Sequence, residues 1–263
     1  MQGLTEFLPV SSSGHLALLE QFFGMEPRLY LAAALHLGTL GAVFVHYRKD
    51  IRHVVVESFS FLAVAVGPKQ DIRVAWRDKQ GARMGVLIII ACLPTALLGL
   101  AISRVWHAFA GSLLLVSLGL VFTAGMLFVI RFFAGEQKKE ITWRFALFIG
   151  AAQGLAAFPG ISRSGTTIAA ALLLGIDRKD SARFSFLISI PAILGAVLLE
   201  ADTLLMIRGA HIPAVVLGTL TAGVVGYLAL RLLLRWLDSG RLHLFYYYVL
   251  PLGISGIAWS LLR

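Results

Sequence analysis

QGLTEFLPVSSSGHL at Gln2–Leu16 and QGLAAFPGISRSGTT at Gln153–Thr167 are two copies of one motif, aligned without a gap at an offset of 151 residues. The positions that are identical in both copies are Gln2/Gln153, Gly3/Gly154, Leu4/Leu155, Phe7/Phe158, Ser11/Ser162, Ser13/Ser164 and Gly14/Gly165. This agreement indicates that the chain contains a duplicated half.

The differences between the two copies fall on residues with useful chemistry. The first copy carries Glu6 and His15 where the second has alanine and threonine, and the second carries Arg163 where the first has Ser12. We therefore predict that one copy supplies acid–base groups and the other a fixed cation.

The composition indicates a membrane protein. Hydrophobic residues make up 58% of the chain and charged residues 14%, which excludes a soluble globular domain. At about 1.5 Å per residue the long apolar runs approach or match the ~30 Å hydrocarbon core of a bilayer, and they do not alternate as the strands of a barrel would. These runs are Leu29–His46, Met84–Ser103, Leu113–Ile130, Phe184–Leu199 and Ile212–Leu230. The expected fold class is an all-α polytopic membrane protein.

Basic residues between the apolar runs predict how the chain is oriented. The net charge is +9, and we interpret these residues as orientation signals and not as a nucleic-acid surface. Arg48–Arg83 and Arg131–Arg144 are predicted to be cytoplasmic. The loop before Phe184–Leu199 is also basic, whereas the equivalent segment Ala33–Arg48 is basic at its far end. The two helices should then run in opposite directions, which predicts an inverted-topology repeat.

The duplication predicts two halves, residues 1–134 and residues 135–263, that together form one membrane domain. The alignment calls for a counterpart of Lys138–Ala152 ahead of Gln2, and the sequence contains none. The first half is expected to lack an N-terminal half-helix, either because the start is truncated or misassigned or as a real feature of the protein.

Each motif is predicted to form a half-helix, a break and a second half-helix. Pro9 and the pair Pro159–Gly160 end a helix that reaches them, and the serines that follow are good caps for a new helix. Irregular backbone at membrane depth must be satisfied by protein or by a wet cavity. Two such broken or re-entrant elements are expected to meet at a central site. His53–Gly67 is short for a span and is predicted to be an interfacial or partly inserted helix.

Glu6 is the first candidate functional residue. Gln2 and Glu6 are four residues apart and share one face of a helix. A carboxylate in an apolar segment is costly unless it has a partner or a task. The functional interpretation is therefore favoured over a satisfied packing carboxylate, for which Arg163 would be a partner.

The serines of both motifs predict an anion site. Serine hydroxyls and free amides at the start of a half-helix attract anions, and the planar fork of an arginine suits phosphate. Two facing loops of this kind would cradle a diphosphate, whereas simple helix capping would need only one serine in each. The predicted phosphate-binding residues are Ser11, Ser13, Ser162, Arg163, Ser164 and Thr167.

His15 is the only histidine inside a repeated motif. Beside Ser12 and Glu6 it is predicted to act as a general base or as a nucleophile at phosphorus, the alternative being a satisfied core histidine. The histidines interpreted as structural or interfacial are His36, His46, His53, His107, His211 and His243.

A divalent cation is a further expectation. No residues have the spacing of a complete zinc site. A Mg²⁺ or Ca²⁺ ion held jointly by a carboxylate and substrate phosphate stays open, with Glu6 and Gln2 as its candidate ligands.

The two motifs, together with HLGTLGAVFVHYRKDI, LPTALLGL and ARFSFLISIPAILGA, resemble the undecaprenyl-diphosphate phosphatases of the bacitracin-resistance type, over nearly the whole chain. The resemblance implies that Gln2 and Glu6 fill the family's E/Q-x-x-x-E positions. Ser12 and His15 would be its catalytic serine and histidine, and Arg163 its pyrophosphate-binding arginine. The residues that align with supporting positions are Ser11, Ser162, Ser164 and Thr167. Family members normally have an apolar segment before the first motif, which this sequence lacks.

The resemblance implies an enzyme that removes the terminal phosphate of undecaprenyl diphosphate, recycles the lipid carrier for cell-wall synthesis and confers bacitracin resistance. It also implies a divalent cation, a bacterial plasma-membrane location with the site toward the outer face, and it leaves a homodimer open. The alternative is a transporter or flippase for a lipid phosphate, because inverted repeats with broken helices are typical of transporters. Acid–base groups in only one copy favour catalysis, although one protein could combine catalysis with flipping of the carrier.

Overall fold

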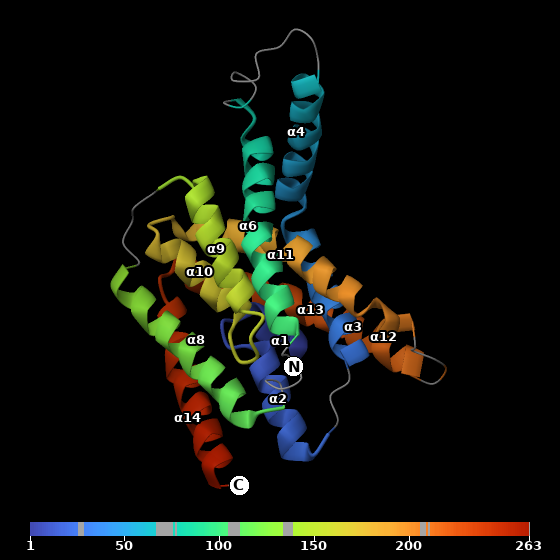
Figure 1. Cartoon of the computed structure of the whole chain (residues 1–263), viewed down its shortest axis with the longest axis vertical. Helices are drawn as coiled ribbons and strands as arrows, with labels where there is room; N and C mark the ends of the chain where they lie inside the picture. Colours follow the sequence, from blue (N-terminus) through green and yellow to red (C-terminus); the bar gives the residue numbers. More distant parts are fainter. Residues whose placement is uncertain are drawn as a thin grey trace.

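The computed structural model describes residues 1–25, 29–66, 76, 78–104, 111–133, 139–205, 209 and 211–262, and in these ranges it is a bundle of helices (Figure 1). The predicted all-α class is confirmed. The elements are α1 Gln2–Phe7, α2 Ser12–Phe23, α3 Leu29–His46, α4 Arg48–Val66, α6 Gln80–Ser103, α8 Leu113–Phe133, α9 Trp143–Leu155, α10 Arg163–Leu173, α11 Arg178–Leu199, α12 Ala201–Leu205, α13 His211–Asp238, the 3₁₀ turn η1 Leu242–Phe245 and α14 Tyr246–Leu262. The boundary expected between the two halves, at residues 134 and 135, lies outside the described residues.

Several helices are long and apolar enough to cross a membrane. Among the described residues there are five, or six if the pair Tyr30–His46 and Arg48–Val64, bent by 79°, counts as one span. Four of the five predicted apolar runs lie in these helices, and the fifth, Leu29–His46, lies in the bent pair. The last span, Leu242–Leu262, is not among the runs predicted from hydropathy, because three tyrosines at the start of α14 make that segment less apolar.

Both motifs are broken helices, as the prolines predict. In the first, the chain is extended at Leu8 and α2 begins after Ser11, whose side chain accepts a hydrogen bond from the Gly14 N–H. In the second, Ser162 caps α10 in the same way by accepting from the Gly165 N–H. Ser11 has φ +66°, a conformation that a residue other than glycine rarely adopts. The first break is therefore the more strained one.

The segment predicted as a short interfacial helix is longer than expected. It forms α4, Arg48–Val66, which is bent away from α3 and packs along the start of α6. The Gly81 N–H at the start of α6 donates to Glu57 Oε2 of α4 at 2.6 Å. Gly67, the end of the predicted segment, lies outside the described residues.

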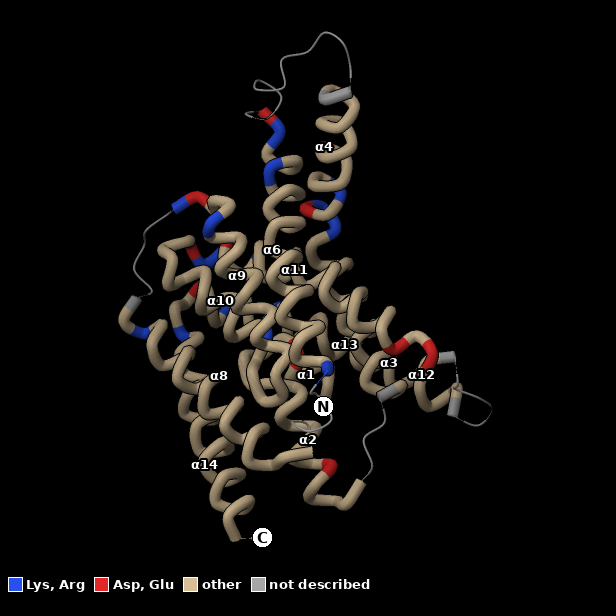
Figure 2. The backbone as a smooth tube through the Cα atoms, in the orientation of Figure 1, with Lys and Arg blue, Asp and Glu red and all other residues tan. Residues whose placement is uncertain are grey.

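Basic residues gather at one end of the bundle, where α6 and α9 begin and α8 ends (Figure 2). Two ion pairs tie helices together there: Arg83 of α6 with Glu140 at 3.2 Å, and Arg183 of α11 with Asp50 of α4 at 2.7 Å. The second pair places the start of α11 beside the end of α3. These two helices therefore run in opposite directions, as expected from the loop charges, while the inverted repeat of the whole chain stays a prediction.

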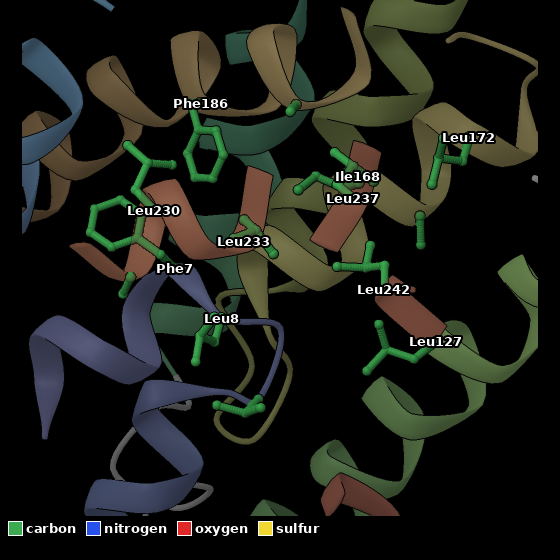
Figure 3. Packing of buried hydrophobic residues seen from close by; sticks show 14 of the residues in the cluster. Phe7, Leu8, Leu127, Ile168, Leu172, Phe186, Leu230, Leu233, Leu237 and Leu242 are labelled. Atoms are coloured by element: carbon green, nitrogen blue, oxygen red, sulfur yellow. The ribbon is translucent and has the colours of Figure 1, made fainter. Parts of the chain in front are cut away.

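A shared core holds the two broken helices together (Figure 3). Phe7 of α1 packs on Phe186 of α11 with ring centroids 5.8 Å apart, and Leu230 of α13 and Ile168 of α10 belong to the same cluster. All four side chains are fully buried. Because α1 and α10 are anchored in one cluster, the polar end of α1 faces the polar start of α10.

Glycines allow the closest helix crossings. A Cβ atom built on Gly150 of α9 would lie 2.1 Å from the Ala91 carbonyl oxygen of α6, and one on Gly38 of α3 would lie 2.1 Å from the Thr219 carbonyl oxygen of α13. In a membrane, such close backbone approach is a main source of helix association, because lipid offers no hydrophobic driving force.

We expect Gly150→Ala to lower the thermal unfolding temperature of the protein in detergent. The added methyl group must push α9 from α6, and overpacking of this kind costs roughly 1–3 kcal/mol. The matched control is Gly125→Ala, also in mid-helix, where a Cβ meets nothing within 4 Å. That change should leave the protein as stable or slightly more stable. Equal unfolding temperatures for the two variants would contradict the close contact between Gly150 of α9 and Ala91 of α6.

Candidate functional site

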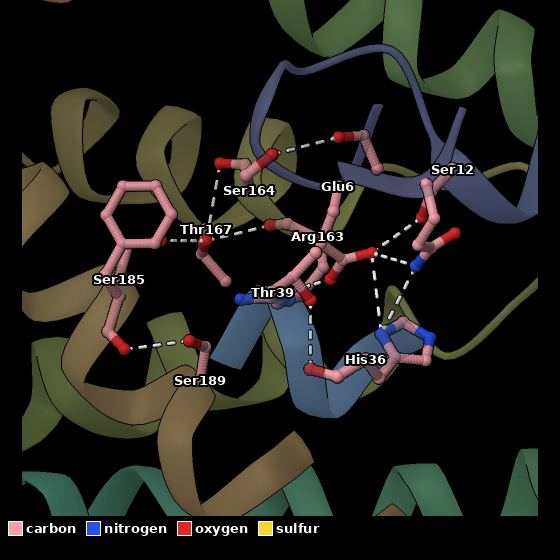
Figure 4. Close-up of polar contacts among 12 residues, drawn as sticks. Glu6, Ser12, His36, Thr39, Arg163, Ser164, Thr167, Ser185 and Ser189 are labelled. Atoms are coloured by element: carbon pink, nitrogen blue, oxygen red, sulfur yellow. Dashed lines mark hydrogen bonds and ion pairs between the residues drawn. The ribbon is translucent and has the colours of Figure 1, made fainter. Parts of the chain in front are cut away.

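The two broken helices meet through a buried ion pair. Arg163, the first residue of α10, donates from Nη2 to Glu6 Oε1 at the end of α1 (Figure 4). Their side chains are 15% and 6% exposed. A second link runs from the Gly160 N–H to Ser13 Oγ at 3.3 Å. The expected meeting of the motifs is confirmed. The pairing of Glu6 with Arg163, which was named only for the alternative of a satisfied packing carboxylate, is also present.

The other carboxylate oxygen of Glu6 collects two further donors. Glu6 Oε2 accepts from Gln2 Nε2 and from Ser12 Oγ, each at 2.8 Å. Gln2 and Glu6 share one face of α1, as their spacing predicts. Ser12 comes from the start of α2, so its hydroxyl proton is directed at Glu6 (Figure 4).

His36 of α3 also belongs to this cluster. Its Nδ1 lies 3.6 Å from Glu6 Oε2 and 3.3 Å from Gln2 Nε2. The sequence did not indicate these polar contacts of His36, which arise because α3 packs against α1. The interpretation of His36 as a structural or interfacial histidine stays a prediction. One signal in the sequence was available: His36 is the only ionisable side chain in the run 31–45.

Glu200 interacts electrostatically with the same histidine. It follows α11, outside the spans, and burial raises the pKa of its carboxyl while the charge of His36 acts to lower it. His36 therefore interacts with two carboxylates, the buried Glu6 and the half-buried Glu200.

The hydroxyls predicted to bind phosphate also organise the two helix starts. Ser11 and Ser162 are the caps of α2 and α10. Ser164 Oγ lies 3.4 Å from Ser162 Oγ. Thr167 Oγ1 donates to the Arg163 carbonyl at 2.8 Å and contacts Ser185 Oγ. Capping, the alternative, is thus present at Ser11 and Ser162, and phosphate binding by these hydroxyls stays a prediction.

Four buried polar atoms of the two motifs have no hydrogen-bond partner among the described residues: Gln2 Oε1, Gln153 Oε1, Arg163 Nη1 and Thr166 Oγ1. A buried polar atom without a partner costs about 1–3 kcal/mol, and such atoms in a native structure call for an explanation. Arg163 Nη1 is a charged donor suited to an anion, and Gln2 Oε1 is an acceptor suited to a cation. Among the described residues the cluster therefore has an unpaired donor that suits an anion and an unpaired acceptor that suits a cation.

His15 is directed away from this cluster. Its Nδ1 lies 2.8 Å from the Ser11 carbonyl oxygen, and its Nε2 lies 2.8 Å from the Tyr248 hydroxyl of α14. Both ring nitrogens are engaged there, so the expected direct grouping of His15 with Ser12 and Glu6 is not the arrangement observed. Sequence reasoning missed Tyr248, which is 233 residues away along the chain.

A cavity of about 380 Å³ opens beside His15 and Tyr248. Its walls are mainly apolar and come from α1, the break, the end of α13, η1 and α14; they include Leu4, Leu8, Trp236 and Phe245. The combination of apolar walls with two convergent polar groups is typical of a ligand pocket.

The oxygens of this site fit a hard cation in part. Among the described residues no three His, Cys, Asp or Glu side chains lie close enough to hold a metal ion. Glu6 and the partnerless Gln2 Oε1 offer oxygen ligands, and Mg²⁺ in particular often uses one or two carboxylates plus substrate phosphate. A cation at these residues would therefore depend on substrate oxygens.

Fold and site together define a multi-pass helical membrane protein with a largely buried cluster of polar and charged side chains between two broken helices. The chain belongs to the family described as bacitracin resistance protein BacA, which matches residues 1–255. The family resemblance seen in the motifs is thereby confirmed.

Named relatives are similar over almost their full length. The undecaprenyl-diphosphatase of Desulfosudis oleivorans is 46% identical over 259 residues, which covers 96% of this chain and 93% of the relative. That of Desulforapulum autotrophicum is 42% identical over 260 residues, 98% and 94% of the two chains. That of Korarchaeum cryptofilum is 40% identical over 259 residues, 97% and 94%. These names support a phosphatase over a transporter or flippase.

Proposed function

We propose that this chain hydrolyses undecaprenyl diphosphate to undecaprenyl phosphate and inorganic phosphate, which returns the lipid carrier to cell-wall synthesis and protects against bacitracin. The names of the relatives support this activity. The observation that carries it is the buried Arg163, with one nitrogen paired to Glu6 and the other without a partner among the described residues.

Arg163 binds the diphosphate in this proposal. Glu6 holds Nη2 and so fixes the guanidinium plane, which leaves Nη1 to donate to a phosphate oxygen. The N–H groups at the start of α10 add partial positive charge at the same place. In phosphoryl transfer, negative charge spreads over the phosphoryl and leaving oxygens, and a preorganised cation stabilises it.

Proton transfer has two acceptors. Glu6 already receives the hydrogen bond of the Ser12 hydroxyl, so it orients this oxygen and can take its proton. His15 donates from Nδ1 to the Ser11 carbonyl, and its Nε2 accepts a hydrogen bond from the Tyr248 hydroxyl beside the cavity. In the net reaction water adds to the terminal phosphorus and the bond to the bridging oxygen breaks. The proton released passes to the Tyr248 oxygen as the hydroxyl of Tyr248 gives its own proton to His15 Nε2.

A divalent cation would be held by Glu6 and Gln2 together with diphosphate oxygens. When bound, it would neutralise charge on the diphosphate.

We place the site toward the outer face of the bacterial plasma membrane. The basic helix ends favour the cytoplasmic side, and α3 runs from the site to one of them. His36 in the second turn of α3 is twelve residues before Arg48, or about 18 Å along a helix. The site thus lies away from the basic end, which supports access from outside.

Purified protein in detergent should release phosphate from undecaprenyl diphosphate. Excess EDTA should lower the rate at least about tenfold, because a cation shared with the substrate would be removed, and added Mg²⁺ or Ca²⁺ should restore it. The activity is excluded if intact, folded protein releases no phosphate with either ion. Full activity in EDTA would refute only the cation.

A further inference from the structure

His15 and Tyr248 form a hydrogen-bonded pair outside the charged cluster. The His15 side chain is buried, and its two nitrogens contact different elements: Nδ1 the Ser11 carbonyl of its own break, Nε2 the Tyr248 hydroxyl of α14. A carbonyl oxygen only accepts, so Nδ1 carries the proton. Nε2 is then an acceptor, and the tyrosine hydroxyl is its donor.

The geometry makes Tyr248 an orienting partner for the whole ring. The imidazole and phenol planes are nearly parallel, at 17°, with centroids 5.7 Å apart. An imidazole held only at Nδ1 could still swing about that hydrogen bond. The second bond, on the opposite side of the ring, removes this freedom.

Both side chains border the cavity of about 380 Å³, whose walls include Leu8, Trp236 and Phe245. Hydrogen bonds are stronger in apolar surroundings than in water. The hydrogen bond from Tyr248 to His15 Nε2 thus lies at the edge of a space large enough for substrate atoms and water.

We infer that Tyr248 is a positioning residue for His15 and the link between His15 Nε2 and water in the cavity. As the tyrosine oxygen takes the proton released by the attacking water, the hydroxyl gives its own proton to Nε2. This inference rests on the proposed function of His15 as proton acceptor, and Tyr248 acts through His15.

The test is Tyr248→Phe, which removes the hydroxyl and keeps the ring. The matched control is Tyr247→Phe in the same helix turn, which is 64% exposed against 52% for Tyr248 and does not line the cavity. We expect Tyr248→Phe to lower kcat for phosphate release by roughly 10- to 100-fold, the cost of a small misplacement of a reacting group, with KM changed less than about twofold. Tyr247→Phe should behave as the unchanged protein.

A spectroscopic readout separates this inference from the activity itself. In protein with ¹⁵N-labelled histidine, the His15 signals are assigned by their loss in His15→Gln. Tyr248→Phe should shift the signal of the acceptor nitrogen Nε2, whereas Tyr247→Phe should leave that signal where it is in the unchanged protein. An unshifted Nε2 signal, or a KM increase at unchanged kcat, would overturn the positioning role. Lack of phosphate release by the unchanged protein would instead refute the function, and the shift would still report the pair.

Discussion

Replacing Arg163 by alanine is expected to lower kcat for phosphate release by roughly 10³-fold, within the range measured for removal of a donor or an arginine that stabilises a phosphoryl transition state. The change removes the only charged donor of the cluster that has an unpaired nitrogen among the described residues, Nη1. Glu6 keeps Gln2 and Ser12 as hydrogen-bond donors and His36 nearby, so the variant should still fold in detergent. Turnover equal to the unchanged protein would remove Arg163 from the mechanism.

Arg163→Lys tests whether charge alone suffices. A lysine keeps the cation but cannot hold Glu6 with one nitrogen and a phosphate with another in a fixed plane. We expect its rate to lie between those of the alanine variant and the unchanged protein. Arg144→Ala, at an exposed arginine of α9, is the matched control and should leave phosphate release unchanged.

Replacing Glu6 by glutamine should affect both activity and stability. Arg163 and His36 lose the negative charge that both approach, and the amide has one acceptor oxygen in place of the two that accept from Arg163 and Ser12. Removal of one partner from a buried ion pair costs about 3–5 kcal/mol, and we expect kcat to fall by about 10²-fold or more, as for loss of general acid–base catalysis. Phosphate release and thermal unfolding in detergent measure the two effects.

A double variant separates the two effects of Glu6. Glu6→Gln combined with Arg163→Gln leaves no uncompensated charge in the pair, so it should be more stable than Glu6→Gln alone, while activity should stay lost. Glu140→Gln is the surface control, because the Glu140 side chain is 84% exposed in its pair with Arg83 and such pairs contribute little. Recovery of activity in the double variant would show that Glu6 has a structural role only.

Much of the bundle could be predicted from local features of the chain. Apolar runs of sufficient length predicted the helices α3, α6, α8, α11 and α13, because a span must satisfy its backbone within itself. Pro9 and Pro159 predicted the two breaks. The bend at Tyr47 between α3 and α4 was not predicted, since neither proline nor glycine marks it.

The site was predictable in its residues but not in its contacts. The mismatches between the motif copies pointed to Glu6 and Arg163, which form the ion pair. They also pointed to His15, whose ring contacts Tyr248 and not Ser12. A motif fixes which side chains share a turn of helix, whereas the directions of those side chains depend on the neighbours that pack around them.

The sequence by itself determined the membrane-helix class, the two breaks and the family. It also pointed to the two oppositely charged residues of the central pair, Glu6 and Arg163. Apolar runs and prolines affect the chain locally, so the helices and breaks that they cause can be predicted without knowledge of the tertiary structure. The tertiary structure alone decided that His36 joins Glu6 across 34 residues and that Tyr248 joins His15 across 233. It also decided which nitrogen of Arg163 is left for a ligand. These contacts arise from helix packing, in which close approach at small residues brings distant polar groups within hydrogen-bonding distance.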